Sequence, residues 1–181
     1  MYKDLSLLPR QAIRLAALGI LAAGPMSYAR LASEVRQFTS RLAGPSPELM
    51  GTSIELLRLE GLARSTDGSD DESHPETVME ITGEGRAELI ELLGAPVRPP
   101  STEIGRLILG LKFRFMHLLD APARGDQIAM MIEACESELA RLVDLRTRHV
   151  EEPGHLIDWL DFEIGQVEDR LEWLRGFSVG A

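Results

Sequence analysis

The chain has 181 residues, room for one large domain or two small ones, and 44% of them are hydrophobic, which predicts a packed core and excludes wholesale disorder. Only 5% are aromatic, while Leu, Ala, Glu and Arg are abundant, a balance that favours helix over strand. The net charge of -10 excludes a generally basic surface, so any contact with nucleic-acid phosphates has to come from a local patch.

The single cysteine, Cys135, cannot form a disulfide within the chain, so we expect a reducing, cytoplasmic environment. The apolar run Leu15–Ala23 follows basic residues, as the core of a signal peptide would. However, Asp4 and Arg14 interrupt that pattern, and the run is about half the length of a membrane span. We therefore interpret it as a buried helix and expect no membrane partner.

Glycine, proline and serine divide the first half of the chain into short segments. Three helices are predicted first, over 9–23, 28–42 and about 47–60, with Ser27 as the N-cap of the second. Two short strands, 62–66 and 77–82, follow and are joined by a polar loop, and Thr82 then caps a fourth helix over 83–93. This order is that of a winged helix-turn-helix with one added helix.

The second half of the chain is predicted to be helical. Residues 95–102 hold three prolines without periodicity and form a predicted stiff linker between a winged-helix domain, 1–94, and a helical domain, 103–181. Helices are predicted over about 102–119, 126–149 and 154–176. The fold class is therefore mainly α with a small two-stranded β-wing, as a winged helix-turn-helix plus a three-helix domain.

In the last helix the apolar residues alternate spacings of three and four, which predicts a coiled-coil-like seam for dimerisation. The seam residues are Ile157, Leu160, Ile164, Val167, Leu171 and Leu174. Burying six such side chains offsets the cost of association only narrowly, so we expect the first helix or the helix over 102–119 to add dimer surface.

Four strings of the sequence, in order, resemble the PadR family of bacterial regulators. They are LGILAAGPMSYARL at 18–31, SPELMGTSIELLRLEGL at 46–62, MEITGEGRAEL at 79–89 and RLEWLRGF at 170–177. In that family such strings belong to the first two helices, the recognition helix, the strand and cap of the next helix, and the end of the last helix. The resemblance implies a homodimer that binds double-stranded operator DNA without a cofactor.

The resemblance also implies where DNA would be contacted. Tyr28 would hydrogen-bond a phosphate at the start of the second helix, where the helix N-terminus favours anions. The alternative is a ring packed in the core with its hydroxyl at the surface. The other candidates are Arg30, Arg41, Ser46, Thr52, Ser53 and Arg64. A surface arginine of an acidic protein is more often the partner of a nearby carboxylate, so for each arginine both interpretations stay open.

The recognition helix departs from the family pattern. Gly51 stands where the family often has Tyr, Glu48 and Glu55 lie on the solvent side, and the wing tip, Asp67–Glu72, is acidic. Carboxylates are repelled by phosphate, although glutamate accepts a hydrogen bond from cytosine N4. These features favour an alternative function, in which a winged-helix module has lost DNA binding and docks a basic partner protein.

No catalytic constellation is found, so we do not expect an enzyme. Cys135 lies on an apolar helical stripe, which predicts a buried, inert thiol. His149 and His155 lie close in sequence with two glutamates between them, but their spacing fits no helical pair of ligands and Pro153-Gly154 marks a loop. We therefore expect an exposed loop without a metal ion.

Trp159 and Trp173 lie in the last helix beside the seam. Among PadR-like regulators an aromatic-lined hollow can take an apolar effector, so the resemblance makes these two side chains a candidate effector pocket. The alternative, which we favour, is that they fill the core of the dimer. The function expected from the sequence is a dimeric, ligand-responsive transcription regulator that represses its target.

Overall fold

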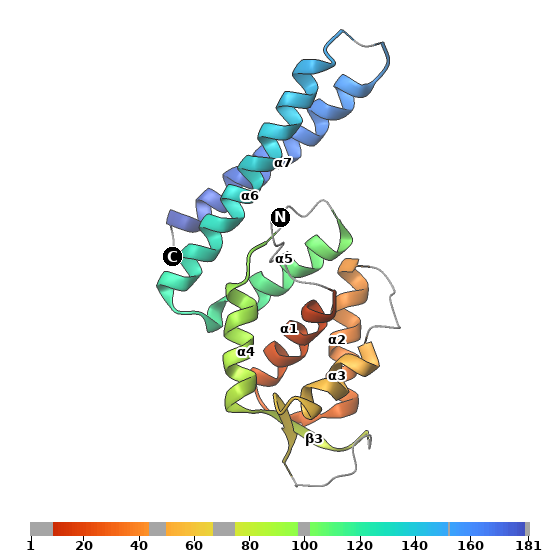
Figure 1. Cartoon of the computed structure of the whole chain (residues 1–181), viewed down its shortest axis with the longest axis vertical. Coiled ribbons are helices and arrows are strands. Elements are labelled where there is room, and N and C mark those ends of the chain that lie inside the picture. The colour runs from red at the N-terminus through yellow and green to blue at the C-terminus, as the bar shows by residue number, and fades with distance from the viewer. Residues whose placement is uncertain (1–8, 44–49, 67–74, 98–101, 152, 180–181) are drawn as a thin grey trace. The chain divides into compact units, whose positions relative to one another are not determined.

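The computed structural model describes residues 9–43, 50–66, 75–97, 102–151 and 153–179 (Figure 1). The chain divides into two compact units, the first of residues 1–96 and 100–119 and the second of residues 97–99 and 120–181. The first unit therefore includes the helix over 103–115, which the sequence analysis grouped with the carboxy-terminal helices. Of the described helices, none is both long enough and apolar enough to cross a membrane.

The first unit has the element order predicted for a winged helix-turn-helix, with one further strand and one further helix. Its elements are α1 (Pro9–Ala22), β1 (Met26–Ser27), α2 (Tyr28–Ala43), α3 (Met50–Leu59), β2 (Ala63–Ser65), β3 (Val78–Ile81), α4 (Gly83–Gly94), α5 (Glu103–Phe115) and the 3-10 turn η2 (Met116–Leu118). The fold class is thus confirmed as mainly helical with a small antiparallel sheet.

The sheet has three strands in the order β1-β3-β2, all antiparallel. The hairpin of β2 and β3 is the predicted wing, and its register sets Arg64 opposite Glu80. The two-residue strand β1 pairs Met26 with Met79 and was not predicted. It joins the start of α2 to the wing, because the backbone N–H of Tyr28 donates to the Thr77 carbonyl at 2.9 Å.

Helix α1 is the centre of the first unit and lies between α4 on one side and α2 and α3 on the other (Figure 1). The predicted buried run is confirmed, since Leu15 and Leu18 have no exposed surface. Gly19 lets α5 approach closely, because a Cβ there would lie 2.6 Å from ring carbons of Phe115. Each large apolar side chain buried in this way stabilises the fold by about 1.5–3 kcal/mol.

The helix ends of the first unit are fixed by local hydrogen bonds. The Thr82 side chain accepts from the Gly85 backbone N–H and caps α4, as predicted. Gly61 ends α3 with a φ of 73°, a left-handed conformation in which the Leu62 N–H donates back to the Leu57 carbonyl at 2.8 Å. The wing therefore starts at a fixed angle to α3.

Lys112, on α5, is the one charged side chain buried in the described part of the chain, with 1% exposure. Its Nζ donates to the carbonyls of Leu93 and Ala95, both at 2.6 Å, and of Leu92 at 3.4 Å. These are carbonyls at the end of α4, where the helix dipole favours a cation. Lys112 thereby joins α5 to α4.

The second unit contains α6 (Ala121–Arg148) and α7 (Leu156–Val179), which pack side by side over their length (Figure 1). Asp120 caps α6 by accepting from the Ala123 N–H at 2.9 Å. Ion pairs join the two helices, among them Arg175 Nη2 with Glu136 Oε1 at 2.8 Å. The predicted helices over 126–149 and 154–176 are confirmed, and α6 begins earlier than expected.

The apolar seam of α7 packs mainly within the chain. Leu160, Val167, Leu171 and Leu174 are all at most 3% exposed, and Ile157 and Ile164 are half-buried. Their burial is against α6, the element that packs on α7. The spacing of the seam correctly predicts a buried face, but four of the six residues predicted to meet a second copy have almost no surface left for it.

Candidate nucleic-acid interface

The start of α2 is held by internal hydrogen bonds. The Ala29 N–H donates to the Pro75 carbonyl at 3.0 Å, and the Arg30 N–H lies 3.4 Å from the Ser27 hydroxyl, which confirms Ser27 as the N-cap. The backbone N–H of Tyr28 also donates, to the Thr77 carbonyl, so the backbone N–H groups that could bind a phosphate at this helix end already have partners. An anion at this end of α2 would rely on side chains and the helix dipole.

Tyr28 is half-buried at the start of α2, directly after β1. Burial, and secondarily the carboxylate of Glu55 on α3, raise the pKa of the Tyr28 hydroxyl above its ordinary value. The hydroxyl therefore stays protonated and can donate a hydrogen bond to a phosphate oxygen. The nearby negative charge of Glu55 opposes the same contact.

Two of the candidate arginines have carboxylate partners. Arg30 Nε lies 3.0 Å from Glu34 Oε1, one turn along α2. Arg64 Nε lies 2.7 Å from Glu80 Oε1, in the cross-strand pair that the register sets. Both guanidiniums are largely exposed, so such pairs are weak and a phosphate could compete for them.

Arg41, in the last turn of α2, is exposed, and its guanidinium has no ion pair or hydrogen bond with any described residue. The guanidinium of Arg36, a residue not among the predicted contacts, is likewise exposed and without such a partner among the described residues. At helical spacing Arg41 shares the face of α2 that carries Arg30, and Arg36 lies on a different flank. These two arginines are the cations of α2 most readily available to phosphate.

Helix α3 buries Ile54 and Leu57 and turns Glu55, Leu56 and Leu59 outward, with Leu59 72% exposed. The backbone of Thr52 and Ser53 lies in α3, but their side chains, like the whole of Ser46 and the wing tip, fall outside the described residues. The outer face of α3 is thus partly apolar and carries one carboxylate without a described partner.

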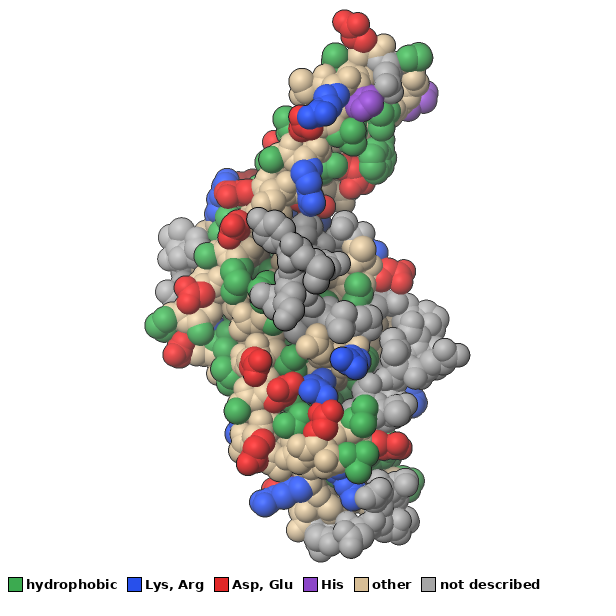
Figure 2. Space-filling view, in the orientation of Figure 1, with side chains coloured by type: hydrophobic (Ala, Val, Ile, Leu, Met, Phe, Trp, Pro, Cys, Tyr) green, Lys and Arg blue, Asp and Glu red, His purple; other side chains and the backbone are tan. Residues whose placement is uncertain are grey.

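In the view of Figure 2 acidic and basic side chains are interspersed, and the described Lys and Arg form no continuous strip on this face. On this face, a contact with phosphate would have to be local, as the net charge predicts.

The aromatic residues of α7 lie on its outer side. Trp159 and Trp173 are 52% and 50% exposed, and Phe162 and Phe177, which the sequence analysis did not name, are 64% and 45% exposed. The rings of Trp173 and Phe177 meet edge to face with centroids 4.8 Å apart. Their spacing of three, eleven and four residues places the four on one flank of the helix, which we call the aromatic stripe.

The titratable groups form no catalytic arrangement in the described part of the chain. Cys135 is buried, and burial raises the pKa of its thiol, so little thiolate exists near neutral pH. His155 pairs with Asp158 at 3.0 Å, and no group of three His, Cys, Asp or Glu side chains among the described residues is placed to hold a metal ion.

Comparison with solved structures finds similar chains of low identity. PadR of Bacillus subtilis has a TM-score of 0.41 and 16% identity, covering 98% of this chain and 97% of that one. The smu.1604c protein of Streptococcus mutans UA159 has a TM-score of 0.39 and 18% identity, covering 94% of this chain and 98% of that one. No curated protein matches the sequence significantly.

The sequence itself matches a family of AphA-like transcriptional regulators over residues 2–178. The match covers both structural units, and it confirms the predicted transcriptional regulator. The family consists of transcriptional regulators and not of enzymes. The chain belongs to the AphA-like family of transcriptional regulators.

Proposed function

We propose that the first unit binds operator DNA with α3 in the major groove and α2 against the backbone. The observation that carries this is the outward face of α3, where Glu55, Leu56 and Leu59 are exposed, together with the exposed Arg36 and Arg41 of α2, whose guanidiniums have no ion pair with any described residue. Tyr28 and the exposed Arg30 would add phosphate contacts, and Ser46, Thr52, Ser53 and Arg64 remain candidates for the same surface.

We further propose that the regulator is a homodimer joined through the aromatic stripe of α7. Four large aromatic side chains on one flank, each 45–64% exposed, form the kind of surface that a partner usually covers. A two-fold pair would present two copies of α3 to successive major-groove faces of a palindromic operator. Trp159 and Trp173 would then lie in the dimer contact rather than line an effector pocket.

Repression and response to a small molecule complete the proposal. A dimer in which a ligand changes the spacing of the two winged helices would release its operator, because only one spacing matches both half-sites. A regulator of transcription acts on chromosomal DNA, so we place the chain in the cytoplasm.

The DNA proposal is tested by fluorescence anisotropy with a duplex of the chain's own promoter. Replacing Arg36 and Arg41 by glutamine is expected to weaken binding about tenfold at low salt. Each phosphate contact that is lost means that fewer counterions are released from the DNA when the protein binds. The control replaces Arg106 and Arg141, exposed arginines on α5 and α6, and removes the same charge elsewhere. Equal effects of the two double variants would contradict the assignment of the surface.

The second candidate function is a winged-helix module that docks a protein. The exposed Leu59 and Leu56 beside Glu55 on α3 favour it, since apolar surface with a carboxylate suits a basic amphipathic partner better than phosphate. A photo-crosslinking residue at position 59, used in cells, distinguishes protein docking from DNA binding. The module predicts a protein adduct without enrichment of promoter DNA, and the regulator predicts the enrichment.

A further inference from the structure

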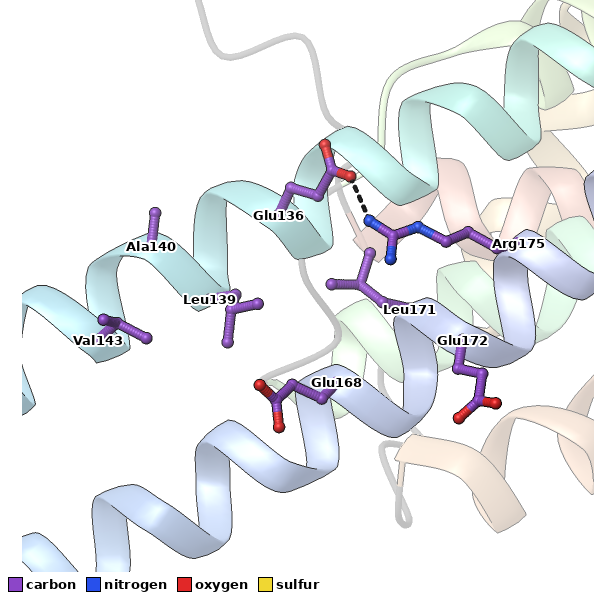
Figure 3. A pocket seen from close by; sticks show the side chains of 8 residues that line it. All are labelled: Glu136, Leu139, Ala140, Val143, Glu168, Leu171, Glu172 and Arg175. Atoms are coloured by element: carbon purple, nitrogen blue, oxygen red, sulfur yellow. Dashed lines mark hydrogen bonds and ion pairs between the residues drawn. The ribbon is translucent and has the colours of Figure 1, made fainter.

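A groove with a volume of about 490 Å³ lies between α6 and α7, within the second unit (Figure 3). Leu139 and Val143 of α6 and Leu171 of α7 give it an apolar floor. Leu171 is 3% exposed, whereas Val143 is 44% exposed, so the floor runs from packed core to open surface. A ligand with an apolar body would cover hydrocarbon that is now in contact with water.

Charge around this floor is mostly negative. Three carboxylates line it, Glu136, Glu168 and Glu172, together with one guanidinium, that of Arg175. Figure 3 shows Arg175 joined to Glu136 across the two helices, and this pair is 2.8 Å long. Glu168 and Glu172 are exposed and form no ion pair with any described residue. The groove therefore combines an apolar floor with two uncompensated negative charges.

We propose that this groove binds an amphipathic organic cation, with its hydrocarbon body over Leu139, Leu171 and Val143 and its charged centre beside Glu168 and Glu172. An anion of the same shape would meet two carboxylates with no free cation to balance them. A neutral molecule would gain only the contact with the floor. If the chain is the ligand-responsive regulator proposed above, an organic cation is the class of its effector.

The groove and the aromatic stripe lie on opposite flanks of α7. Around the helix axis, Glu168, Leu171 and Arg175 of the groove lie roughly 140–160° from Trp173, and Glu172 lies about 100° from it. A dimer that covers the aromatic stripe therefore leaves the groove open to a ligand.

The test is calorimetric titration of the full chain, without DNA, with two ions of one shape and opposite charge. Tetraphenylphosphonium is expected to bind saturably, at one per chain, and more weakly as salt is raised, whereas tetraphenylborate is not expected to bind. The double variant Glu168→Gln, Glu172→Gln is expected to lose on the order of fivefold in phosphonium affinity at low salt. The control, Glu163→Gln with Asp169→Asn, removes the same charge from other sides of α7 and is expected to keep the affinity.

Equal binding of the two ions, equal losses in the two double variants, or no binding of phosphonium would each overturn the proposal. A second copy of the chain seated in the groove would show differently, as a changed dimer dissociation constant for the Glu168, Glu172 variant in sedimentation, and would also overturn it. Because no DNA is present, failure here leaves the DNA proposal standing, and failure of promoter binding leaves the cation site standing.

Discussion

Replacing the buried Lys112 with methionine tests how α5 is attached to α4. Methionine keeps the length of the side chain and removes the ammonium, so the carbonyls of Leu93 and Ala95 each lose a donor 2.6 Å away. A hydrogen bond from a charged group contributes about 1.5–3 kcal/mol, so the two short ones contribute about 3–6 kcal/mol. The carbonyls left behind are partly enclosed and gain no replacement donor from methionine.

The buried charge itself offsets part of that loss. Burial lowers the pKa of Lys112 from 10.5 to about 8. At about 1.4 kcal/mol for each pKa unit, the ammonium costs the folded state roughly 3 kcal/mol at neutral pH. We therefore expect Lys112→Met to lower the free energy of unfolding by about 0–3 kcal/mol at pH 7, the difference of these contributions.

The pH dependence gives a second and sharper expectation. Between pH 8 and 10.5 the unfolded chain holds the Lys112 proton and the folded chain has released it. The free energy of unfolding therefore gains a contribution that grows with pH across this window, and that contribution is lost as pH falls through 8. The stability gap between wild type and Lys112→Met should widen by about 2 kcal/mol between roughly pH 7 and 9.5.

Urea unfolding followed by circular dichroism, at one fixed protein concentration, measures both expectations. Arg106→Met, an exposed change on the same helix, controls for the loss of one positive charge and should show a gap independent of pH over this range. A Lys112→Met variant more stable than wild type at pH 7, or a gap that does not widen, would refute the reasoning.

Three further substitutions test the packing, the DNA surface and the dimer. Gly19→Ala places a Cβ 2.6 Å from the Phe115 ring and should lower the free energy of unfolding, measured in urea, by about 1–3 kcal/mol. The control Gly125→Ala, whose Cβ would have no neighbour within 4 Å, should not destabilise the fold, and equal effects of the two substitutions would contradict the close contact. Glu55→Gln removes a carboxylate from the outer face of α3 and should tighten promoter binding about two- to fivefold at low salt, measured by anisotropy; weaker binding would mean that Glu55 contacts a base. Phe162→Ser removes the most exposed ring of the aromatic stripe and should weaken the dimer at least about tenfold in sedimentation, and an unchanged dimer would exclude this surface.

The elements of the first unit could be predicted closely because their ends carry strong local signals. Gly24-Pro25 ends α1, Ser27 and Thr82 cap α2 and α4, and Gly61 ends α3 in the left-handed conformation that glycine permits. These signals depend on a few neighbouring residues, which the sequence displays directly. The strand β1 carries no such signal, because two residues have no periodicity and their partner Met79 is distant in the chain.

Features that depend on distant contacts were not predictable in the same way. The alternating spacing of α7 reports that one face is buried, but not whether α6 or a second copy covers it, and α6 does so for Leu160 and Leu174. Lys112 stands next to apolar residues of α5, yet its burial depends on where α4 ends in space. The carboxylate partners of Arg30 and Arg64 were foreseen as the open alternative, since i, i+4 and cross-strand pairs are short-range.

The central claim is that this acidic chain binds operator DNA through exposed arginines of α2, with α3 in the major groove. The most direct measurement is binding of the full chain to its own promoter duplex across salt concentrations. Arg36 and Arg41 from two copies give about four phosphate contacts, which predicts affinity falling about a hundredfold between roughly 50 and 200 mM salt. Affinity independent of salt, or no saturable binding at the lowest salt, would contradict the claim.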